Sequence, residues 1–378
     1  MDPLQYIDQH KEALLNTFHE LHALAEPSWE EKKTSAYIEN LLRKAGLNVK
    51  TFNQHYGIIA EIPGLTQHVV ALRADLDALL QEVNGVVKAN HSCGHDAHST
   101  MVLYTALSIA ASGFVPKQTL RFIFQPAEEK GEGALQMIKE GALNNVFSLF
   151  GIHLRPIFEI PPMKASPVIV HGSAGTVKGT IQGIQAHASR PQDGINAIEV
   201  AAMLVEKLRN VSLETDVPYS IKMTQLQVAN EASNIIPGLA DFSLDLRAQT
   251  NEVMDELQKK LTQIVSEVST LSGAKINWKL ADLVPAAIQN ETAKKIATQA
   301  IVDILGKENI IPVCTSNGGE DFHFYTAKSK GLKATMIGLG CGLSPGLHHP
   351  EMTFHLDALL YGTKILTKTI LLASEQSS

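Results

Sequence analysis

Four short apolar runs along the chain are each followed by polar side chains, and this pattern restricts the fold more than any other feature. The runs cover residues 69–72, 119–124, 147–152 and 334–338, with helical patterns such as residues 96–111 between them. Strands that alternate with helices are typical of an α/β layer fold with a mostly parallel sheet. Ligands of such sheets bind outside the carboxyl ends of the strands, so we expect the polar groups to converge there.

The segment between residues 174 and 283 follows a different pattern. It reads as a strand at 176–184, a helix at 193–211, strands at 219–228 and 241–248, a helix at 251–271 and a strand at 275–281. The order βαββαβ is that of the ferredoxin-like unit. We therefore predict a small domain, residues 174–284, inserted into a larger one formed by residues 1–173 and 285–378.

Composition and charge narrow the classes of protein. The net charge of -7 comes with no basic cluster, so we expect neither a nucleic-acid nor a membrane partner. The N-terminus lacks the pattern of a signal peptide, and no apolar stretch approaches the roughly 20 residues of a membrane span. Three cysteines are too few for a disulfide framework, and they predict a cytoplasmic protein.

Near the N-terminus, Ser28 and Glu31 have the spacing of a capping box that begins a helix. Gly46 is typical of the position at which such a helix ends. We expect a helix between these two signals.

The strongest local motif is HSCGHDAH at residues 91–98. A thiolate at Cys93 and an imidazole at His95 can face one metal ion from a loop, and Gly94 allows the tight turn between them. Taken alone, the same spacing also fits a buried cysteine beside surface histidines.

Glu128 and Glu129 follow the second apolar run. Adjacent carboxylates repel each other, so their burial at a strand end is costly unless a cation or a proton transfer requires them. One can ligate a metal while its neighbour acts as general base. The alternative is the solvated first turn of a helix, where acidic residues are favoured.

Further ligand-type residues follow the other strands. His153 comes after the third run, and His348 with His349 follows the fourth; each can be a ligand or a residue at the rim of the sheet. Asp75 and Asp77 can orient a ligating histidine, or they can be turn residues.

The inserted domain carries three polar residues of interest. His187 lies at the end of its first strand, Asn234 precedes an apolar pair, and Arg247 ends a strand. Arginine suits bidentate binding of a carboxylate. Without the other motifs, Arg247 reads equally well as a surface residue with an acidic neighbour.

In this order the motifs resemble those of the M20 metallopeptidase and aminoacylase family, in particular its amidohydrolase branch. That branch includes bacterial aminoacylases, N-acetyl-diaminopimelate deacetylases and plant auxin-conjugate hydrolases. The resemblance covers nearly the whole chain and is carried by LRADLDAL at 72–79, CGHDAH at 93–98, QPAEE at 125–129, GIH at 151–153, the His187 segment, NIIP at 234–237, GEDF at 319–322 and LHHP at 347–350. Each motif alone is weak, but the ordered set is specific. Many relatives have Leu-Pro where this chain has Leu79-Leu80, in a loop that borders the active site, so substrate preference can differ.

The resemblance implies a zinc-peptidase-like mixed sheet, mostly parallel and flanked by helices, with an inserted ferredoxin-like dimerisation domain. It implies two divalent ions per subunit, with zinc or manganese favoured and cobalt or nickel compatible with the same ligands. Alignment of the motif selects His348 over His349. The implied roles are metal ligation by Cys93, His95, Glu129, His153 and His348, support from Asp75, general-base catalysis by Glu128, and substrate contacts by His187, Asn234 and Arg247.

These roles predict hydrolysis of the amide bond of an N-acyl amino acid, for example an N-acetyl one. A water bridging the two ions attacks, Glu128 takes its proton, and His187 of a homodimer partner stabilises the oxyanion. A dipeptidase or carboxypeptidase on the same site is the main alternative. The presence of Glu128 argues against a non-catalytic metal-binding protein, and the missing Gly-x-Gly-x-x-Gly argues against a nucleotide-binding protein.

The three cysteines give a first test. We expect Cys93→Ser to reduce metal content and activity sharply, because it removes a thiolate ligand. Cys314→Ser and Cys341→Ser are the matched controls and should retain both. Metal analysis of the three purified variants measures this, and equal tolerance at all three positions would refute the assignment.

Overall fold

The computed structural model describes residues 1–228 and 232–376, and these form two compact units. The first comprises Met1–Val170, Ile288–Thr315 and the chain from Asp321 onward. The second comprises His171–Ala287 together with Ser316–Glu320, a short segment that the predicted domain bounds place in the larger domain.

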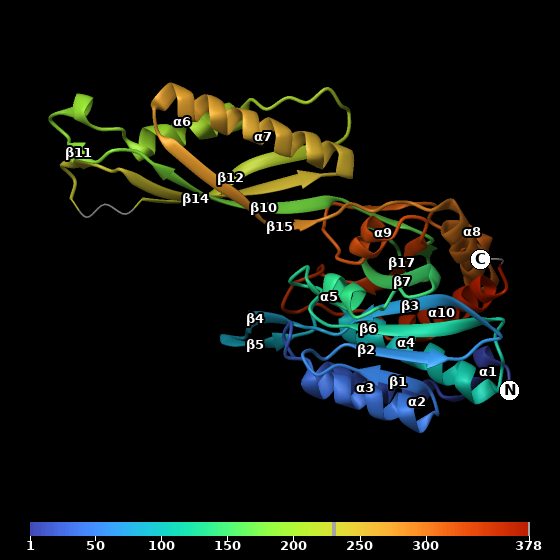
Figure 1. Ribbon diagram of the computed structural model, residues 1–378. Helices are drawn as coiled ribbons and strands as arrows, with labels where there is room; N and C mark the ends of the chain where they lie inside the picture. The colour runs from blue at the N-terminus through green and yellow to red at the C-terminus, as the bar shows by residue number, and fades with distance from the viewer. Residues whose placement is uncertain (229–231, 377–378) are drawn as a thin grey trace. The chain divides into compact units, whose positions relative to one another are not determined.

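A mixed seven-stranded sheet forms the centre of the first unit (Figure 1). Its four predicted strands are neighbours at the centre and run parallel, which confirms the predicted fold class. The outer pairs are antiparallel. In spatial order the strands are β1 (Asn48–Thr51), β2 (Ile58–Ile62), β6 (Gln118–Gln125), β3 (Thr66–Asp75), β7 (Val146–Pro156), β17 (Lys333–Leu343) and β8 (Ala165–Ser166).

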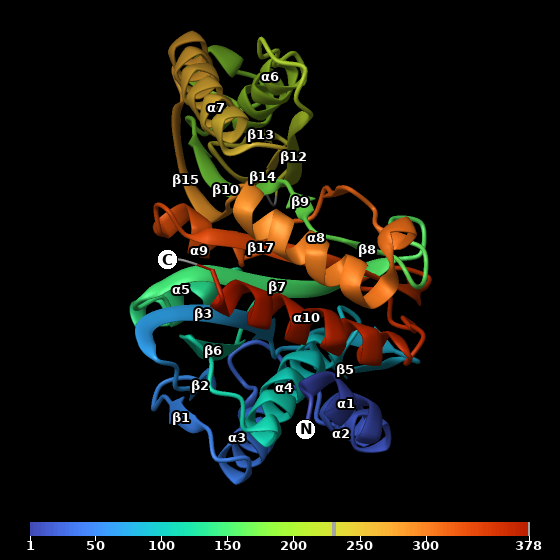
Figure 2. The same ribbon diagram turned by 90° about the vertical axis from the view of Figure 1, so that its right-hand side faces the viewer.

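Helices cover both faces of this sheet because successive strand residues point to opposite sides. On β3, Val70 and Leu72 pack in the core beneath α4 (His95–Ser112) and α10 (Ala358–Ser374), as Figure 2 shows from the side. Ala71 between them belongs to a second core with α5 (Gly133–Lys139) and α9 (His323–Lys328). Both faces are therefore buried, which is why these strands are continuous apolar runs.

Helix α3 (Lys32–Lys44) corrects one prediction. The helix ends before Gly46, which has φ +82° as expected, but the predicted capping box is wrong. The Ser28 hydroxyl donates instead to Asp77 Oδ2 at 2.6 Å, and the Glu26 carboxylate accepts from the backbone of Lys33. A buried carboxylate that needs donors attracts the Ser28 hydroxyl more strongly than the helix end does.

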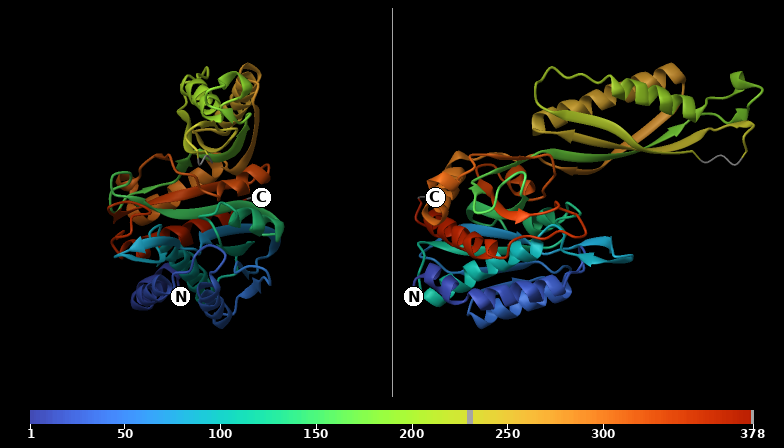
Figure 3. Two further views of the ribbon diagram at one scale, coloured as in Figure 1. Left: turned by 90° about the vertical axis from the view of Figure 1, so that its left-hand side faces the viewer. Right: turned by 180° about the vertical axis from the view of Figure 1, so that it is seen from behind.

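The second unit is a four-stranded antiparallel sheet in the order β12–β14–β10–β15, which is the ferredoxin-like arrangement. Its strands are β10 (Ser173–Gln182), β12 (Tyr219–Val228), β14 (Leu239–Ala248) and β15 (Lys275–Val284). Helices α6 (Ala197–Arg209) and α7 (Asn251–Ser272) lie on one face of it (Figure 3). The predicted order βαββαβ is confirmed; α6 starts later than predicted because Asn196 caps it, accepting from the backbone N–H of Ile198.

The remaining elements are short or peripheral. They are α1 (Pro3–Gln9), α2 (Lys11–Ala23), α8 (Glu291–Leu305), β4 (Leu79–Val83), β5 (Val86–Asn90), β9 (Ile169–His171), β11 (Ala186–His187), β13 (Ile235–Ile236), β16 (Cys314–Ser316), and 3-10 turns at Pro191–Asp193 and Lys307–Asn309. Among the helices in the described ranges, none is both long and apolar enough to cross a membrane.

Glu31, at the start of α3, is fully buried. Its Oε1 accepts from the backbone N–H groups of Trp29 and Ala127, whereas Oε2 has no hydrogen bond among the described residues. Burial, with the charge of Asp77 nearby, raises the pKa of Glu31 from 4.5 to about 7. A carboxyl whose pKa is raised by folding stabilises the fold in its protonated form, so this stability is lost as the pH rises from 4.5 through 7.

We therefore expect Glu31→Gln to remove part of the pH dependence of unfolding. Between pH 5 and pH 8 the free energy of unfolding of the metal-free wild type should fall by up to about 3 kcal/mol more than that of the variant. Urea unfolding of both metal-free proteins across this range measures the difference. Metal-free protein is needed because a bound cation also acts on this pKa, and identical pH slopes would contradict the expectation.

Candidate metal centre

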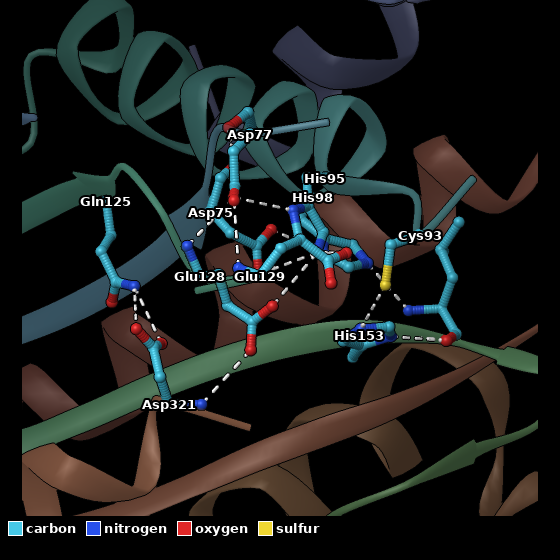
Figure 4. A network of polar contacts seen from close by, with 12 residues as sticks. Asp75, Asp77, Cys93, His95, His98, Gln125, Glu128, Glu129, His153 and Asp321 are labelled. Carbon is cyan, nitrogen blue, oxygen red and sulfur yellow. Dashed lines mark hydrogen bonds and ion pairs between the residues drawn. The ribbon is translucent and has the colours of Figure 1, made fainter. Parts of the chain in front are cut away.

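The polar side chains that follow the central strands converge beyond the strand ends, as predicted (Figure 4). Cys93 and His95 flank Gly94 at the start of α4, Glu129 follows β6, His153 lies on β7 and His348 follows β17. Gly94 has φ +87°, and a Cβ atom there would lie 2.9 Å from the side chain of Leu154. Glycine therefore lets the chain turn between the first two residues.

Among the described residues, five groups of possible ligand atoms meet at this place, and two of them consist only of the predicted ligands. Cys93, His95 and His153 offer atoms that all lie within 4.8 Å of one another, and so do Cys93, Glu129 and His348. Both groups contain the sulfur of Cys93. Cys93, His95, Glu129, His153 and His348 would therefore be the residues that hold divalent ions here.

The chemistry of these atoms fits divalent cations. Nε2 of His95 and Oε1 of Glu129 are buried and form no hydrogen bond with any described residue. Burial and the charge of Glu129 raise the pKa of the Cys93 thiol to about 12, so a thiolate here requires a compensating cation. One sulfur, imidazole nitrogens and one carboxylate suit zinc and other borderline ions.

Asp77 holds several parts of the centre together. Its Oδ1 lies 3.2 Å from Nδ1 of His95. Its two oxygens accept from the backbone N–H groups of Glu128 and Glu129, at 3.2 and 3.0 Å respectively. A hydrogen bond at Nδ1 leaves Nε2 of His95 facing the ligand groups. Burial alone would raise the pKa of Asp77, but the bonds from His95, Ser28 and Glu129 lower it, so the group is a carboxylate.

Asp75, which we predicted beside a ligating histidine, has different partners. Its Oδ1 bonds Nδ1 of His98 at 2.8 Å, and its Oδ2 accepts from Arg73 at 2.6 Å. Asp75 Oδ2 lies 3.8 Å from His95 Nε2. Both aspartates therefore lie beside His95: Asp77 at Nδ1 and Asp75 on the side of Nε2.

Glu128 lies next to the ligand groups. Its Oε2 is 3.9 Å from Nε2 of His95, and its Oε1 accepts from the backbone N–H of Asp321 at 3.3 Å. Its side chain is 10% exposed, which leaves it accessible to a small molecule. Ala127 before it has φ +52°, so the chain turns sharply as it leaves β6.

A buried polar network lies beneath Glu128 and was not predicted. Arg73 and Gln125 both donate to the carboxylate of Asp321, at 2.6 and 2.8 Å, and Tyr325 donates to Gln125. The three residues Arg73, Gln125 and Asp321 belong to motifs that the sequence analysis singled out. A motif shows which residues occur together but not which of them touch, so this network had no sequence signal of its own.

The structure brings two of the three predicted residues of the second unit together. β11 pairs with β13, so exposed His187 lies opposite Ile235, and the carbonyl of the neighbouring Asn234 accepts from Ala188. Ser189 Oγ lies 2.8 Å from Nδ1 of His187.

Arg247 lies on β14 of the four-stranded sheet, whereas β11 and β13 form a separate two-stranded sheet. It forms an exposed ion pair with Asp245 at 2.8 Å and lines a cavity of about 250 Å³ with Ser220 and Asn317. β14 places Arg247 eight residues beyond Leu239, the partner of the last residue of β10. At about 3.3 Å per residue this is roughly 26 Å, so Arg247 and His187 of one subunit cannot touch the same small molecule.

Comparison with known proteins agrees with this geometry. N-acetylcysteine deacetylase of Bacillus subtilis is 28% identical over 96% of this chain and 97% of its own. IAA-amino acid hydrolase ILR1-like 5 of Arabidopsis thaliana is 29% identical over 92% of this chain and 83% of its own. A Bacillus subtilis structure described as a dinuclear metal-binding peptidase of the M20 family superposes with a TM-score of 0.82 at 26% identity, covering 98% of this chain and 100% of that one.

The pattern of peptidase family M20/M25/M40 matches residues 71–372, which span most of the chain and both units. Together with the two ligand groups that share Cys93, this match shows that the chain belongs to peptidase family M20/M25/M40.

Proposed function

We propose that this protein is a metal-dependent amidohydrolase that removes the acyl group from N-acyl amino acids, for example N-acetyl amino acids. The observation that supports this most is the pair of ligand groups sharing Cys93, with the carboxylate of Glu128 beside them. Two of the relatives, a deacetylase of N-acetylcysteine and a hydrolase of IAA-amino acids, are named for amino-acid conjugates.

The residues divide the work as follows. Cys93, His95, Glu129, His153 and His348 hold two divalent ions, which supply Lewis-acid polarisation of the amide carbonyl and lower the pKa of a water molecule. Glu128 takes the proton of the attacking water and delivers it to the leaving amine. The N–H of Asp321 and the Asp77 carboxylate orient Glu128, because they bond its side chain and its backbone. Zinc or manganese suits this ligand set best, and cobalt or nickel is compatible.

Substrate recognition falls to the second unit. Arg247 binds the carboxylate of the amino acid, and His187 with Asn234 contacts the amide oxygen. Since Arg247 and His187 of one subunit are separated by roughly 26 Å along the sheet, both can act on one substrate only from different subunits. We therefore propose a homodimer in which His187 completes the active site of the partner.

A dipeptidase or carboxypeptidase is the second candidate, because one structural relative is described as a peptidase. The two candidate activities differ in the group on the acyl side of the scissile bond: an acyl group in one case and an amino acid in the other. Assay of metal-reconstituted protein on acetyl-, longer-acyl- and aryl-amino acids, with dipeptides alongside, separates them. Faster turnover of dipeptides than of every N-acyl amino acid would overturn the first proposal.

Substitution of each of the two adjacent glutamates in turn tests their roles. We expect Glu128→Gln to keep its metal but lose roughly 10²–10⁴-fold in kcat, because the amide cannot accept a proton. Glu129→Gln should instead lose metal. Metal analysis and kcat of both variants measure this, with the chelated and metal-restored wild type as control. The reverse pattern would show that the two roles are exchanged.

Subunit mixing tests whether His187 acts in the partner's site. Glu128→Gln and His187→Ala are each expected to be inactive alone. In their heterodimer one site carries both defects and the other carries neither, so activity should return to about half of wild type. The matched control combines Glu128→Gln with Cys93→Ser, which leaves one defect in each site and should restore nothing. Verified subunit exchange without recovery would mean that His187 acts within its own subunit or not at all.

A further inference from the structure

A small hairpin connects the segment of Asp77, which follows β3, to the loop of Cys93. It consists of β4 (Leu79–Val83) and β5 (Val86–Asn90), joined by a turn at Asn84 and Gly85 with φ +54° and +78°. The hairpin is a separate two-stranded sheet and is not part of the central one. Its strands therefore extend no edge of the central sheet, and the question is what the hairpin does.

One side chain of this hairpin touches two of the three segments that carry the second group, Cys93, Glu129 and His348. Gln81 Nε2 donates to the carbonyl of His348 at 2.7 Å, and Gln81 Oε1 accepts from the hydroxyl of Ser92 at 2.8 Å. Asn90 adds a donation to Gln81 Oε1 and another to the carbonyl of Pro350. The carbonyl of Ser92 in turn accepts from the N–H of His348 at 2.8 Å. Gln81 thus links the residue before Cys93 to the backbone of His348.

His348 depends on such support more than the other ligands do. Its side chain is 53% exposed, whereas Cys93, His95 and His153 are buried and held by packing. Its backbone has φ +63°, a left-handed conformation that is unfavourable for a residue with a Cβ atom. Its N–H donates to the carbonyl of Ser92 and its carbonyl accepts from Gln81, and these two bonds stabilise that conformation.

We propose that Gln81 is a positioning residue for the group Cys93, Glu129 and His348, and that it sets the affinity of the ion held there. The ion at Cys93, His95 and His153 should be less affected: it shares Cys93, but its two histidines are fixed by α4 and β7. Both halves of the amide are required: a leucine removes donor and acceptor, and a glutamate places a carboxylate against the His348 carbonyl. This inference rests on the proposed dinuclear site.

The test measures bound metal rather than activity. Wild type, Gln81→Leu and Gln81→Glu are loaded with zinc, equilibrated with graded chelator and analysed for metal per subunit. Glu82→Leu is the matched control, since Glu82 neighbours Gln81 on the same strand but is exposed. We expect wild type and Glu82→Leu to hold two ions. Both Gln81 variants should lose one ion at about tenfold lower chelator concentration and retain the other. Circular dichroism checks that the variants are folded.

The experiment distinguishes failure of the proposed metal site from failure of the proposed role of Gln81. If wild type itself does not bind two ions, the proposed metal site fails. If wild type binds two and the Gln81 variants give the same chelator curve, the role of Gln81 is wrong while the site stands. Simultaneous loss of both ions from the Gln81 variants would also overturn it, because the proposed effect is confined to one ligand group. A variant that fails to fold is replaced in the comparison by the other, since Gln81→Glu preserves side-chain size and polarity.

Discussion

The metal centre depends on the hydrogen bonds that the buried carboxylate of Asp77 accepts. This carboxylate receives the Ser28 hydroxyl, the His95 ring and two consecutive backbone N–H groups, so it joins three segments that are distant in sequence. A buried anion with this many donors cannot lose one without leaving a desolvated charge partly unpaired. The orientation of His95 and the course of the turn at Glu128 are therefore fixed by the same group.

The central sheet and the inserted unit could be predicted from the sequence because their signals are long and periodic. Runs such as residues 119–124 are apolar on both faces, which requires helices on both sides of the sheet. The convergence of ligand-type side chains beyond the strand ends could be predicted because these residues belong to motifs placed after strands. Local rules failed where a distant partner was stronger, as at Ser28, whose hydroxyl bonds Asp77 and not the helix end.

The different partners of Asp75 and Asp77 show a second limit. Both aspartates stand in one motif and lie beside His95, and nothing in their spacing says which of them bonds its Nδ1. The structure distinguishes them through partners remote in sequence: Arg73 and His98 engage Asp75, whereas His95 and Glu128 engage Asp77. Likewise, the exposed ion pair of Arg247 with Asp245 gives no sign of function, because surface pairs contribute little to stability. A pair that contributes little can also be exchanged for a substrate carboxylate at little cost.

The distribution of the ligands along the chain has a consequence for biosynthesis. The group Cys93, His95 and His153 is complete once the first 153 residues have been synthesised. The group Cys93, Glu129 and His348 is complete only when His348, in the last part of the chain, has been added. Between them the ribosome must make the whole inserted unit and then β17, which enters the centre of the sheet beside β7. Domains fold largely as units in the order of their synthesis. The nascent protein thus passes through a long interval in which four of the five proposed ligands have been made and only His348 does not yet exist.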